Sequence, residues 1–334
     1  MIQSSAEYCQ EVEGILNERF ADFDDRGKSM SLDTEKVNFA LSDFERCINE
    51  LDSIGETYAL NSDERLAIKN LIGKQVVMNP KEINHFYNSN RELMKYNRSG
   101  KVVPLYLDGL VQTSYDSGHN GFYFSYNSEN VNINWGSDLH GRENNPIVID
   151  VKGNVGSNFC YESSNLSVSI MGNVQKSFCK GSNNIRALVR GDVSVDACEY
   201  TENVALFVDG NVSLSCGQYS ENFFVIILGD VKRFFGSNSK DLSAIVKGKI
   251  QGNSINQSNN ATIETEQING WDSFCNTNNS TLKISDKDSL LNFFHMINDS
   301  GGIRNWPFRK DTNKLILINE DCTEKQVGRF YIQW

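Results

Sequence analysis

The chain has 334 residues, a net charge of −11, a pI near 5.0 and 39% hydrophobic residues. This length predicts two or three domains. A negatively charged protein gains no free energy from releasing the counterions of a nucleic acid, so no direct nucleic-acid binding is expected. The sequence contains neither an apolar run of about 18 residues nor a basic and apolar leader, so we expect neither a membrane span nor a signal peptide.

Residues 1–99 are predicted to form an α-helical domain. Ser4 and Glu7 match a capping box, and the residues that follow have helical spacing: Tyr8, Val12, Ile15, Leu16 and Phe20. Apolar spacing predicts further helices over 37–51, near 62–72 and after Asn79-Pro80, where Asn caps the helix and Pro takes its first position. Residues 1–100 hold 18 acidic and 12 basic residues, over half of the net charge.

Residues 100–147 are predicted to be a transition that caps a following repeat. Alternating apolar residues over 102–107 predict a strand, which Asp108-Gly109 would turn, and an aromatic strand is expected over 122–126. Two of the four histidines lie here. One hypothesis is a small polar pocket at the mouth of the repeat, and the other is surface or first-turn packing. The candidate residues for the pocket are Asp116, His119, His140 and Glu143.

One pattern repeats every 19 residues through the region 148–270, which we predict to be a single repetitive domain. The glycines that mark it are Gly153, Gly172, Gly191, Gly210, Gly229 and Gly248. Each glycine is followed two residues later by Val or Ile. Twelve residues after the glycines come Asn165, Asn184, Asn203, Asn222, Asp241 and Asn260, and a Ser or Thr stands two residues before each of those.

Between these markers the apolar residues alternate with polar ones, as in Leu166, Val168 and Ile170. Alternation is typical of a strand with one buried face, and Gly and Asn tolerate the positive φ of turns. Short strands bury that face by stacking on their copies, with a rise of about 4.8 Å. The prediction is a right-handed parallel β-helix of 19-residue coils, in which the Asn column and the Ser/Thr column each bond to their own kind.

The pattern decays at both ends of the repeat. After Gly248 the next glycine position is Glu266, a spacing of 18 residues, and only partial matches precede Gly153. Residues 271–334 are predicted to be a small α/β cap with a helix that opens at Ser285 and is ended by Gly301-Gly302. Two strands should follow, one around Leu315 and one over 330–334. The fold class is therefore an α+β multi-domain chain with a β-helix between an α-helical N-terminal domain and a C-terminal cap.

Eight cysteines are present, and Cys160, Cys179 and Cys198 share one column of the repeat. Such a column indicates small core residues rather than disulfides. Several glycosylation sequons fall on repeat turns, where glycans would obstruct the ladders. Together these features favour a cytoplasmic protein.

A strand that ends in Gly-Asp/Asn-Val, as at Gly191-Asp192-Val193, Gly210-Asn211-Val212 and Gly229-Asp230-Val231, resembles a known β-helix family. Its module occurs at the C-terminus of glutamate synthase and in formylmethanofuran dehydrogenase. The resemblance covers roughly a third of the chain, and most of the family's further glycines are absent here. It implies a spacer and docking module without catalytic residues of its own.

Motifs for nucleotide binding, serine hydrolases, metalloproteases and zinc ribbons are absent from the sequence, so no cofactor or metal is expected. Asp192 and Asp230 share a column two coils apart, at roughly 10 Å by strand spacing, which is just beyond the range of an inverting glycosidase pair. The same column holds Asn and Lys in other coils, which favours a turn role.

Three functions remain open. The first is a non-catalytic structural or interaction protein that uses a rigid β-helix as a scaffold for a protein partner or a homo-oligomer. The second is an enzyme, or part of an enzyme complex, with a site in 108–143. The third is an inhibitor whose acidic helical domain, including Asp22, Asp24 and Asp25, occupies the basic site of a partner.

Overall fold

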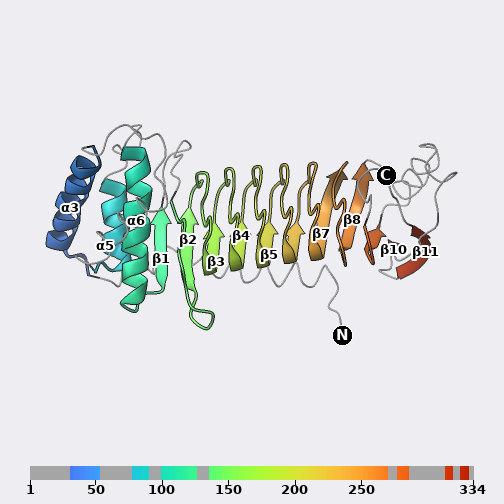
Figure 1. Cartoon of the computed structure of the whole chain (residues 1–334), viewed down its shortest axis with the longest axis horizontal. Helices are drawn as coiled ribbons and strands as arrows, with labels where there is room; N and C mark the ends of the chain where they lie inside the picture. The colour runs from blue at the N-terminus through green and yellow to red at the C-terminus, as the bar shows by residue number, and fades with distance from the viewer. Residues whose placement is uncertain are drawn as a thin grey trace.

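The computed structural model describes residues 31–52, 77–89, 99–125, 135–269, 277–285, 313–318 and 324–330. Within these residues, three helices stand at one end of a long row of strands (Figure 1). The strands form one sheet in which each strand pairs with its neighbours in chain order, from β1 to β11. The protein is a parallel β-solenoid of about seven turns with helical parts at one end.

Helices α3 (Thr34–Asp52) and α5 (Pro80–Ser89) confirm the helices predicted over 37–51 and after Asn79-Pro80. Asn79 and Glu82 form a reciprocal cap, in which the Glu82 carboxylate accepts the backbone N–H of Asn79 at 2.8 Å. In return, Asn79 Oδ1 accepts the backbone N–H of Glu82 at 3.1 Å, so two donors at the helix start are satisfied. The helices predicted at 4–20 and near 62–72 lie outside the described residues.

Helix α6 (Ser99–Asp116) corrects the sequence analysis, because the strand predicted over 102–107 and the turn at Asp108-Gly109 do not form. Alternating apolar residues over 102–107 and the Asp-Gly pair, which is typical of turns, misdirected the prediction. The buried residues in fact recur with helical spacing, as Leu107, Leu110, Val111, Ser114 and Tyr115. Packing against the other helices therefore overrides the local strand and turn preferences.

An aromatic cluster holds the three helices together. Phe44 of α3, Phe86 of α5 and Tyr106 of α6 are buried with ring centroids 5.3–5.9 Å apart. The Tyr106 hydroxyl donates to the backbone carbonyl of Ala40 at 3.0 Å, so its polar end is satisfied in the core.

A second aromatic row continues from the helices into the solenoid. Tyr87 of α5 packs on Phe124, Phe124 on Trp135, and Trp135 on Phe159, with centroids 4.4–5.8 Å apart. Phe159 then stacks on Phe178 in the next coil, with the rings 5° from parallel. The helical end and the solenoid therefore share one continuous core.

Among the described strands, parallel pairing runs from β1 to β10, and β11 is antiparallel to its neighbour. The sheet extends beyond 148–270, since β1 and β9 pair with it. The strands are β1 Gly121–Ser125, β2 Ile147–Lys152, β3 Ser164–Ile170, β4 Asn183–Val189, β5 Glu202–Val208, β6 Glu221–Ile227, β7 Lys240–Gln251, β8 Thr262–Asn269, β9 Thr281–Ile284, β10 Asn313–Ile318 and β11 Glu324–Phe330.

The end strands test the predictions made outside the repeat. Strand β1 confirms the aromatic strand expected over 122–126 in its described part, and β10 confirms the strand around Leu315. Strand β11 ends at Phe330, whereas the sequence predicted a strand that begins there. The helix predicted from Ser285 and residues 331–334 lie outside the described residues.

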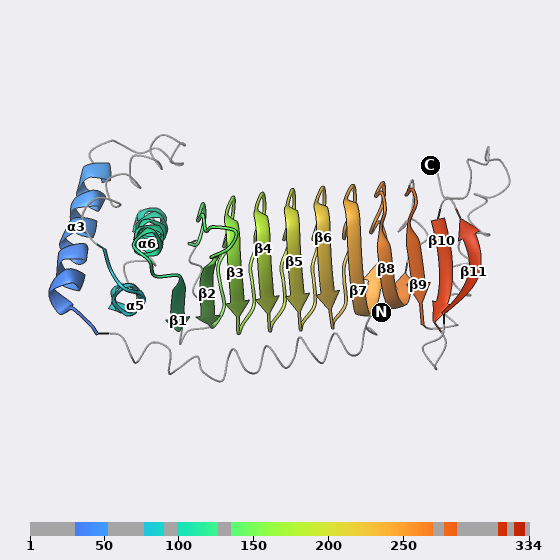
Figure 2. The same ribbon diagram turned by 90° about the horizontal axis from the view of Figure 1, so that it is seen from below.

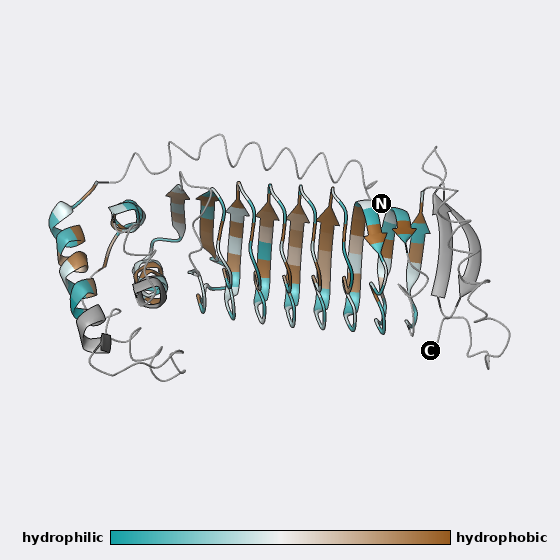
Figure 3. Ribbon diagram, turned by 90° about the horizontal axis from the view of Figure 1, so that it is seen from above, coloured by the Kyte–Doolittle hydropathy of each residue, from teal (hydrophilic) through white to brown (hydrophobic). Residues whose placement is uncertain are grey.

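Register in the central strands follows the repeat. Leu166 pairs with Ile185 and Ile185 with Val204, so that equivalent residues stack along the solenoid (Figures 2 and 3). The shortened spacing at Glu266 corresponds to a register shift between Val246 and Lys249, where β7 pairs with β8. A one-residue change is thus absorbed by a local irregularity.

The Asn column makes the predicted side-chain ladder. Asn184 Nδ2 donates to Asn165 Oδ1 at 3.1 Å, and Asn222 to Asn203 at 2.6 Å. The ladder continues from Asn260 to Asp241 at 2.9 Å. All six residues at this column have positive φ, between 53° and 56°, which Asn and Asp tolerate best among residues with a side chain.

The Ser/Thr column is buried, and its members bond to their own kind only through the backbone, as from the Ser163 and Ser239 N–H groups to the hydroxyls of Ser182 and Ser258. Ser182 Oγ donates to the carbonyl of Cys160 at 2.5 Å, Thr201 Oγ1 to that of Cys198 at 2.9 Å, and Ser220 Oγ to that of Gly217 at 2.6 Å. The hydroxyls therefore satisfy backbone groups at the tight bend before each strand.

The sequence suggested that the column glycines are needed for a positive φ in the turns, but the structure gives a different reason. Among its six members only Gly153 has a positive φ. At the other five, an added Cβ would lie 2.5–2.7 Å from the backbone carbonyl oxygen of the glycine one coil earlier. Glycine is required here because two coils approach closely, and not because the turn needs a left-handed residue.

Side-chain volumes are balanced across the interior. Gly217 faces Phe223, and Gly236 faces Leu242, with no room for a Cβ in either case. The equivalent pairs in other coils are Cys198 with Val204 and Ile255 with Ala261. In each pair, a larger residue on one side of the interior is matched by a smaller residue on the opposite side. Repeats that differ in sequence thereby fill a similar cross-section.

The interior cysteines agree with the expected core role. Cys160, Cys179, Cys198 and Cys216 are buried and free. Burial is the main cause that raises the pKa of the Cys179 and Cys216 thiols well above their ordinary value. These thiols are therefore held in the protonated, unreactive form. In the described part of the chain no helix is long and apolar enough to cross a membrane.

Candidate functional site

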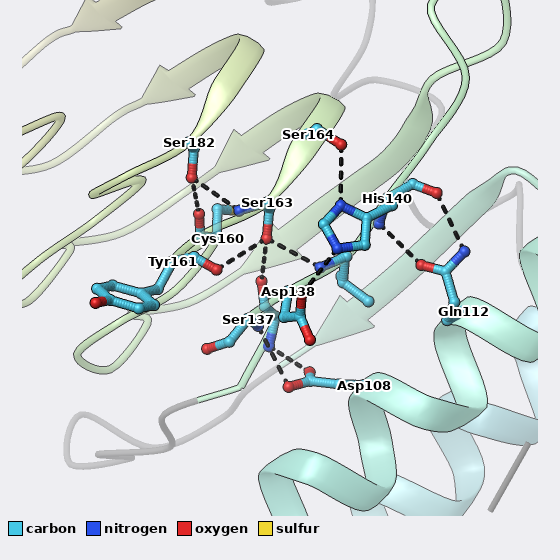
Figure 4. Close-up of polar contacts among 12 residues, drawn as sticks. Asp108, Gln112, Ser137, Asp138, His140, Cys160, Tyr161, Ser163, Ser164 and Ser182 are labelled. Atoms are coloured by element: carbon cyan, nitrogen blue, oxygen red, sulfur yellow. Dashed lines mark hydrogen bonds and ion pairs between the residues drawn. The ribbon is translucent and has the colours of Figure 1, made fainter. Parts of the chain in front are cut away.

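Of the four sequence candidates, His140 lies where helix α6 meets the first solenoid turns (Figure 4). The side-chain amide of Gln112 on α6 makes two hydrogen bonds to the backbone of His140. Its Oε1 accepts the His140 N–H at 2.9 Å, and its Nε2 donates to the His140 carbonyl at 3.1 Å. The same Nε2 donates to Asp116 Oδ1 at 3.2 Å. One amide thus joins two of the predicted residues.

The His140 ring bridges two further side chains. Its Nε2 lies 2.8 Å from Asp138 Oδ1, and its Nδ1 lies 3.0 Å from Ser164 Oγ at the start of β3. The chain hydroxyl–imidazole–carboxylate has the composition of a nucleophilic triad. In that triad the imidazole Nε2 contacts the hydroxyl and Nδ1 contacts the carboxylate, whereas in this chain the two contacts are reversed. The side chains of His140 and Asp138 are 54% and 51% exposed.

A buried carboxylate supports the loop that carries Asp138 and His140. Asp108 of α6 is 1% exposed, and it accepts the backbone N–H of Gly136 at 2.5 Å and that of Ser137 at 3.3 Å. Charge-assisted bonds of this kind are stronger than neutral ones. Asp108 and Gln112 therefore fix the loop to the helix from two sides.

The other two predicted residues stay apart from this network. The backbone N–H of His119 donates to the carbonyl of Ser114 just after α6, and Glu143 lies in the exposed loop before β2. Within the described residues, the side chains of both make no hydrogen bond or ion pair. Of the four candidates, the structure joins Asp116 and His140 through Gln112, and it leaves His119 and Glu143 outside.

Sequence reasoning missed Asp108, Gln112, Asp138 and Ser164. The first two were lost because the segment was taken for a strand and turn, although Asp108, Gln112 and Asp116 recur at every fourth residue, which places them on one helix face. Ser164 and Asp138 gave no signal, because only the fold brings them to His140. Among the described residues, no group of three or more His, Cys, Asp or Glu side chains could hold a metal ion.

Asp192 and Asp230 act as parts of the turn ladder. Asp192 Oδ1 accepts the backbone N–H of Asn211 in the next coil at 2.7 Å, and Asp230 Oδ1 accepts that of Lys249 at 2.8 Å. The side-chain oxygens of Asn154, Asn173 and Asn211 make the same bond. The two carboxylates thus do what the amides do in the other coils. The inhibitor residues Asp22, Asp24 and Asp25 lie outside the described residues.

A second surface stands out on the segments that connect β4 to β7. We define the connector row as four exposed apolar side chains on three successive connectors: Tyr200, Leu214, Tyr219 and Phe234. Tyr200 and Tyr219 stack with centroids 4.9 Å apart and planes 3° from parallel, while they remain 56% and 45% exposed. Lys180 Nζ lies 5.6 Å from the Tyr200 ring centroid, so a cation covers one end of the stack.

Lys180 is itself held in place by an ion pair. Its ammonium donates to the Glu199 carboxylate at 2.5 Å. That hydrogen bond is the main reason why the pKa of Lys180 is raised above its ordinary value. The lysine therefore stays charged beside the tyrosines at neutral pH.

Comparison with known proteins identifies no relative. No family model matches the sequence, and neither a curated protein nor a solved structure matches it significantly. The resemblance to the β-helix of glutamate synthase therefore has support from the solenoid architecture alone.

Proposed function

We propose that this protein is a non-catalytic structural and interaction protein, in which the solenoid separates the helical end from the β10–β11 end and the connector row docks a partner protein. The observation that carries this proposal is the exposed stack of Tyr200 and Tyr219, with exposed Leu214 and Phe234 on the same set of connectors. Exposed apolar side chains gathered on one surface mark interaction sites more often than chance, and Tyr is enriched at protein interfaces.

Rigidity supports the scaffold role. Each coil is tied to the next by strand hydrogen bonds, the Asn ladder and the acceptor ladder at Asn154, Asn173, Asp192, Asn211 and Asp230. A surface built on such a frame loses little conformational freedom on binding. The partner is either a second copy of the chain or another protein.

Light scattering at low and high salt, together with native mass spectrometry, tests the proposal. We expect a defined oligomer that is free of small molecules and that dissociates in the double variant Tyr200→Ser/Tyr219→Ser. The matched control is Met171→Ser, which removes an apolar side chain of similar exposure away from the connector row. A monomer that carries a bound metal or small molecule would overturn this function.

The second candidate is an enzyme with its site in 108–143, extended to Ser164. The chain Asp138–His140–Ser164 favours it, because an imidazole that contacts a hydroxyl can accept its proton as the hydroxyl attacks an ester. Labelling by a fluorophosphonate probe and hydrolysis of p-nitrophenyl acetate test this candidate. Both should be abolished in Ser164→Ala and retained in the control Ser167→Ala. Equal reaction of both variants would exclude Ser164 as a nucleophile.

Three finer assignments belong to the same proposal. The solenoid is taken as right-handed because parallel connections have that hand almost without exception. It is proposed as a spacer module similar to the glutamate synthase β-helix. A reducing, cytoplasmic setting is proposed because four free thiols lie close together in the interior.

A further inference from the structure

The connector row divides into two pairs of apolar side chains, which stand at two different places on their connectors. Leu214 and Phe234 come before a pair of buried residues, whereas Tyr200 and Tyr219 come after one. The buried pairs are Ala197-Cys198, Cys216-Gly217 and Phe235-Gly236. Each connector therefore presents two outward edges, one before its buried pair and one after it.

The edge after the buried pair combines aromatic and acidic side chains. We define the acidic edge as four exposed residues on two successive coils: Tyr200, Glu202, Tyr219 and Glu221. Thr201 and Ser220, which separate each tyrosine from its glutamate, are buried. Each tyrosine and its glutamate therefore stand outward together while the residue between them is turned inward.

Glu202 leaves the charge of the acidic edge uncompensated. It lies opposite Glu221 in the register of β5 and β6, where like charges repel. Lys240 pairs with Glu221. Among the described residues no cation pairs with Glu202, whose carboxylate accepts the side-chain amides of Asn183 at 3.2 Å and Asn203 at 3.3 Å. A cation from outside the chain would offset this repulsion.

The edge before the buried pair combines apolar and basic side chains. We define the basic edge as four exposed residues on two successive coils: Leu214, Lys232, Arg233 and Phe234. In the described part of the chain, neither of the two cations pairs with a carboxylate. Asp196, on the same edge of the coil before, already pairs with Lys176 at 3.3 Å. Asp230 precedes this edge and is matched by Lys249 at the equivalent position of the next coil.

The two edges match each other in spacing as well as in charge. Tyr200 and Tyr219 lie one coil apart, and Leu214 and Phe234 stand on connectors one coil apart. Two solenoids that lie side by side have the same repeat of about 4.8 Å, so contacts between their edges recur in register. A second copy of the chain therefore supplies both the missing cation and the matching apolar spacing.

The tyrosine stack favours a protein partner over a nucleic acid. One face of the Tyr200 ring is covered by the Lys180 ammonium, and the other face is covered by the Tyr219 ring. Bases bind single-strand-binding proteins by stacking on open aromatic faces. The stack instead presents ring edges and hydroxyl groups, which suit the mixed apolar and hydrogen-bonding contacts of a protein interface.

We propose that the acidic edge of one copy docks on the basic edge of a second copy, with the two solenoids side by side. The tyrosines of the acidic edge pack against Leu214 and Phe234, and the cations of the basic edge pair with Glu202. This inference rests on the proposed function, because both edges take their apolar side chains from the connector row, and it names the partner that the row docks.

Charge reversal of each edge tests this pairing. One variant reverses the basic edge by Lys232→Glu/Arg233→Glu, and a second reverses the acidic edge by Glu202→Lys/Glu221→Lys. Analytical ultracentrifugation of the full chain measures self-association of each variant alone and of an equimolar mixture, at low and at high salt. Circular dichroism checks that both variants keep the fold.

A control separates the edges from the effect of overall charge. Lys36→Glu/Arg186→Glu changes the net charge by as much as reversal of the basic edge, at two exposed positions away from both edges. Reversal of the acidic edge lowers the net negative charge of the chain, so any loss of association in that variant cannot come from general repulsion.

We expect the wild type and the control to self-associate, and each reversed variant alone to associate at least about tenfold more weakly, because like charges then meet across the contact. The equimolar mixture should associate again, since the unaltered edge of one variant meets an edge of opposite charge on the other. High salt should weaken the association of the wild type.

Three results would contradict the inference. Undiminished self-association of either reversed variant alone would overturn the pairing of unlike edges and would leave the connector row as a docking surface. A mixture that fails to associate would overturn the direct contact between the two edges. A wild type that stays monomeric would overturn the second copy as the partner, and the proposed function would also fail only if that monomer carried a bound metal or small molecule.

Discussion

The solenoid and the helical end bury apolar side chains by different rules. In the solenoid every interior residue meets its own equivalents in the coils before and after it, so that stability is spread over many similar contacts. At the helical end one cluster of Phe44, Phe86 and Tyr106 joins the three described helices. The effect of a mutation should therefore stay local in the helices, whereas in the solenoid it should depend on how closely the backbones of neighbouring coils approach.

The largest effect is expected at the single cluster of the helical end. Phe44→Ala should lower the free energy of unfolding of this end by about 4 kcal/mol, because it leaves a cavity beside Phe86 and Tyr106. Hydrogen exchange should show α3 and α5 losing protection while β4–β7 keep theirs. Equal loss of protection in both regions would show that the two ends unfold as one unit, contrary to the comparison.

Gly210→Ala should be the most damaging small change in the solenoid, at about 3 kcal/mol. Its Cβ would lie 2.6 Å from the carbonyl oxygen of Gly191, and backbone cannot move aside as a side chain can. The control is Gly181→Ala, where φ is positive but the nearest atom, Cγ of Glu162, is 3.4 Å away. That variant should cost only about 1 kcal/mol. Urea unfolding followed by circular dichroism compares the two, and equal costs would refute the role of close approach.

Volume balance across the interior predicts a rescue. Gly217→Ala alone should cost about 2 kcal/mol, because its Cβ would overlap the ring of Phe223. Adding Phe223→Val copies the neighbouring coil, where Cys198 faces Val204, and should recover about 1 kcal/mol of the loss. A double-mutant cycle in urea measures this coupling. Strictly additive costs would contradict the balance.

Two substitutions of Asp192 distinguish a structural role in the turn from a catalytic role. Asp192→Ala should cost about 1 kcal/mol, because the turn loses the acceptor of the Asn211 N–H. Asp192→Asn should be nearly neutral, since Asn173 makes the same bond to Asp192 in the coil before. Thermal unfolding distinguishes the variants. A large loss in Asp192→Asn would reopen the case for a functional carboxylate.

The smallest effect concerns the ion pair of Lys180 and Glu199 at one end of the tyrosine stack. The hydrogen bond to Glu199 raises the pKa of Lys180 above its unfolded value of 10.5. Its contribution to stability is therefore fully present below pH 10.5, and it is lost as the pH rises through the higher folded pKa. Glu199→Gln should remove this alkaline loss, as seen in the difference between unfolding midpoints at pH 8 and above pH 11. Identical pH profiles for the variant and the wild type would contradict the assignment.

The solenoid could be predicted from the amino-acid sequence. Gly172, Asn184 and Val193 recur at a constant interval because each of these residues packs on the equivalent residue of the next coil. The contacts of one coil are therefore repeated in the next. Helices α3 and α5 were also readable, since a cap and an amphipathic stripe are local signals.

Tertiary structure alone decided the rest. Helix α6 was mispredicted, because its burial is set by packing against α3 and α5 and not by its local apolar alternation and Asp-Gly pair. The network of Asp138, His140 and Ser164 joins residues that no local pattern relates. The cause of the glycine column was hidden for the same reason, since the carbonyl that excludes a Cβ belongs to another coil. Local patterns predict what neighbours along the chain dictate, and contacts between distant segments require the folded chain.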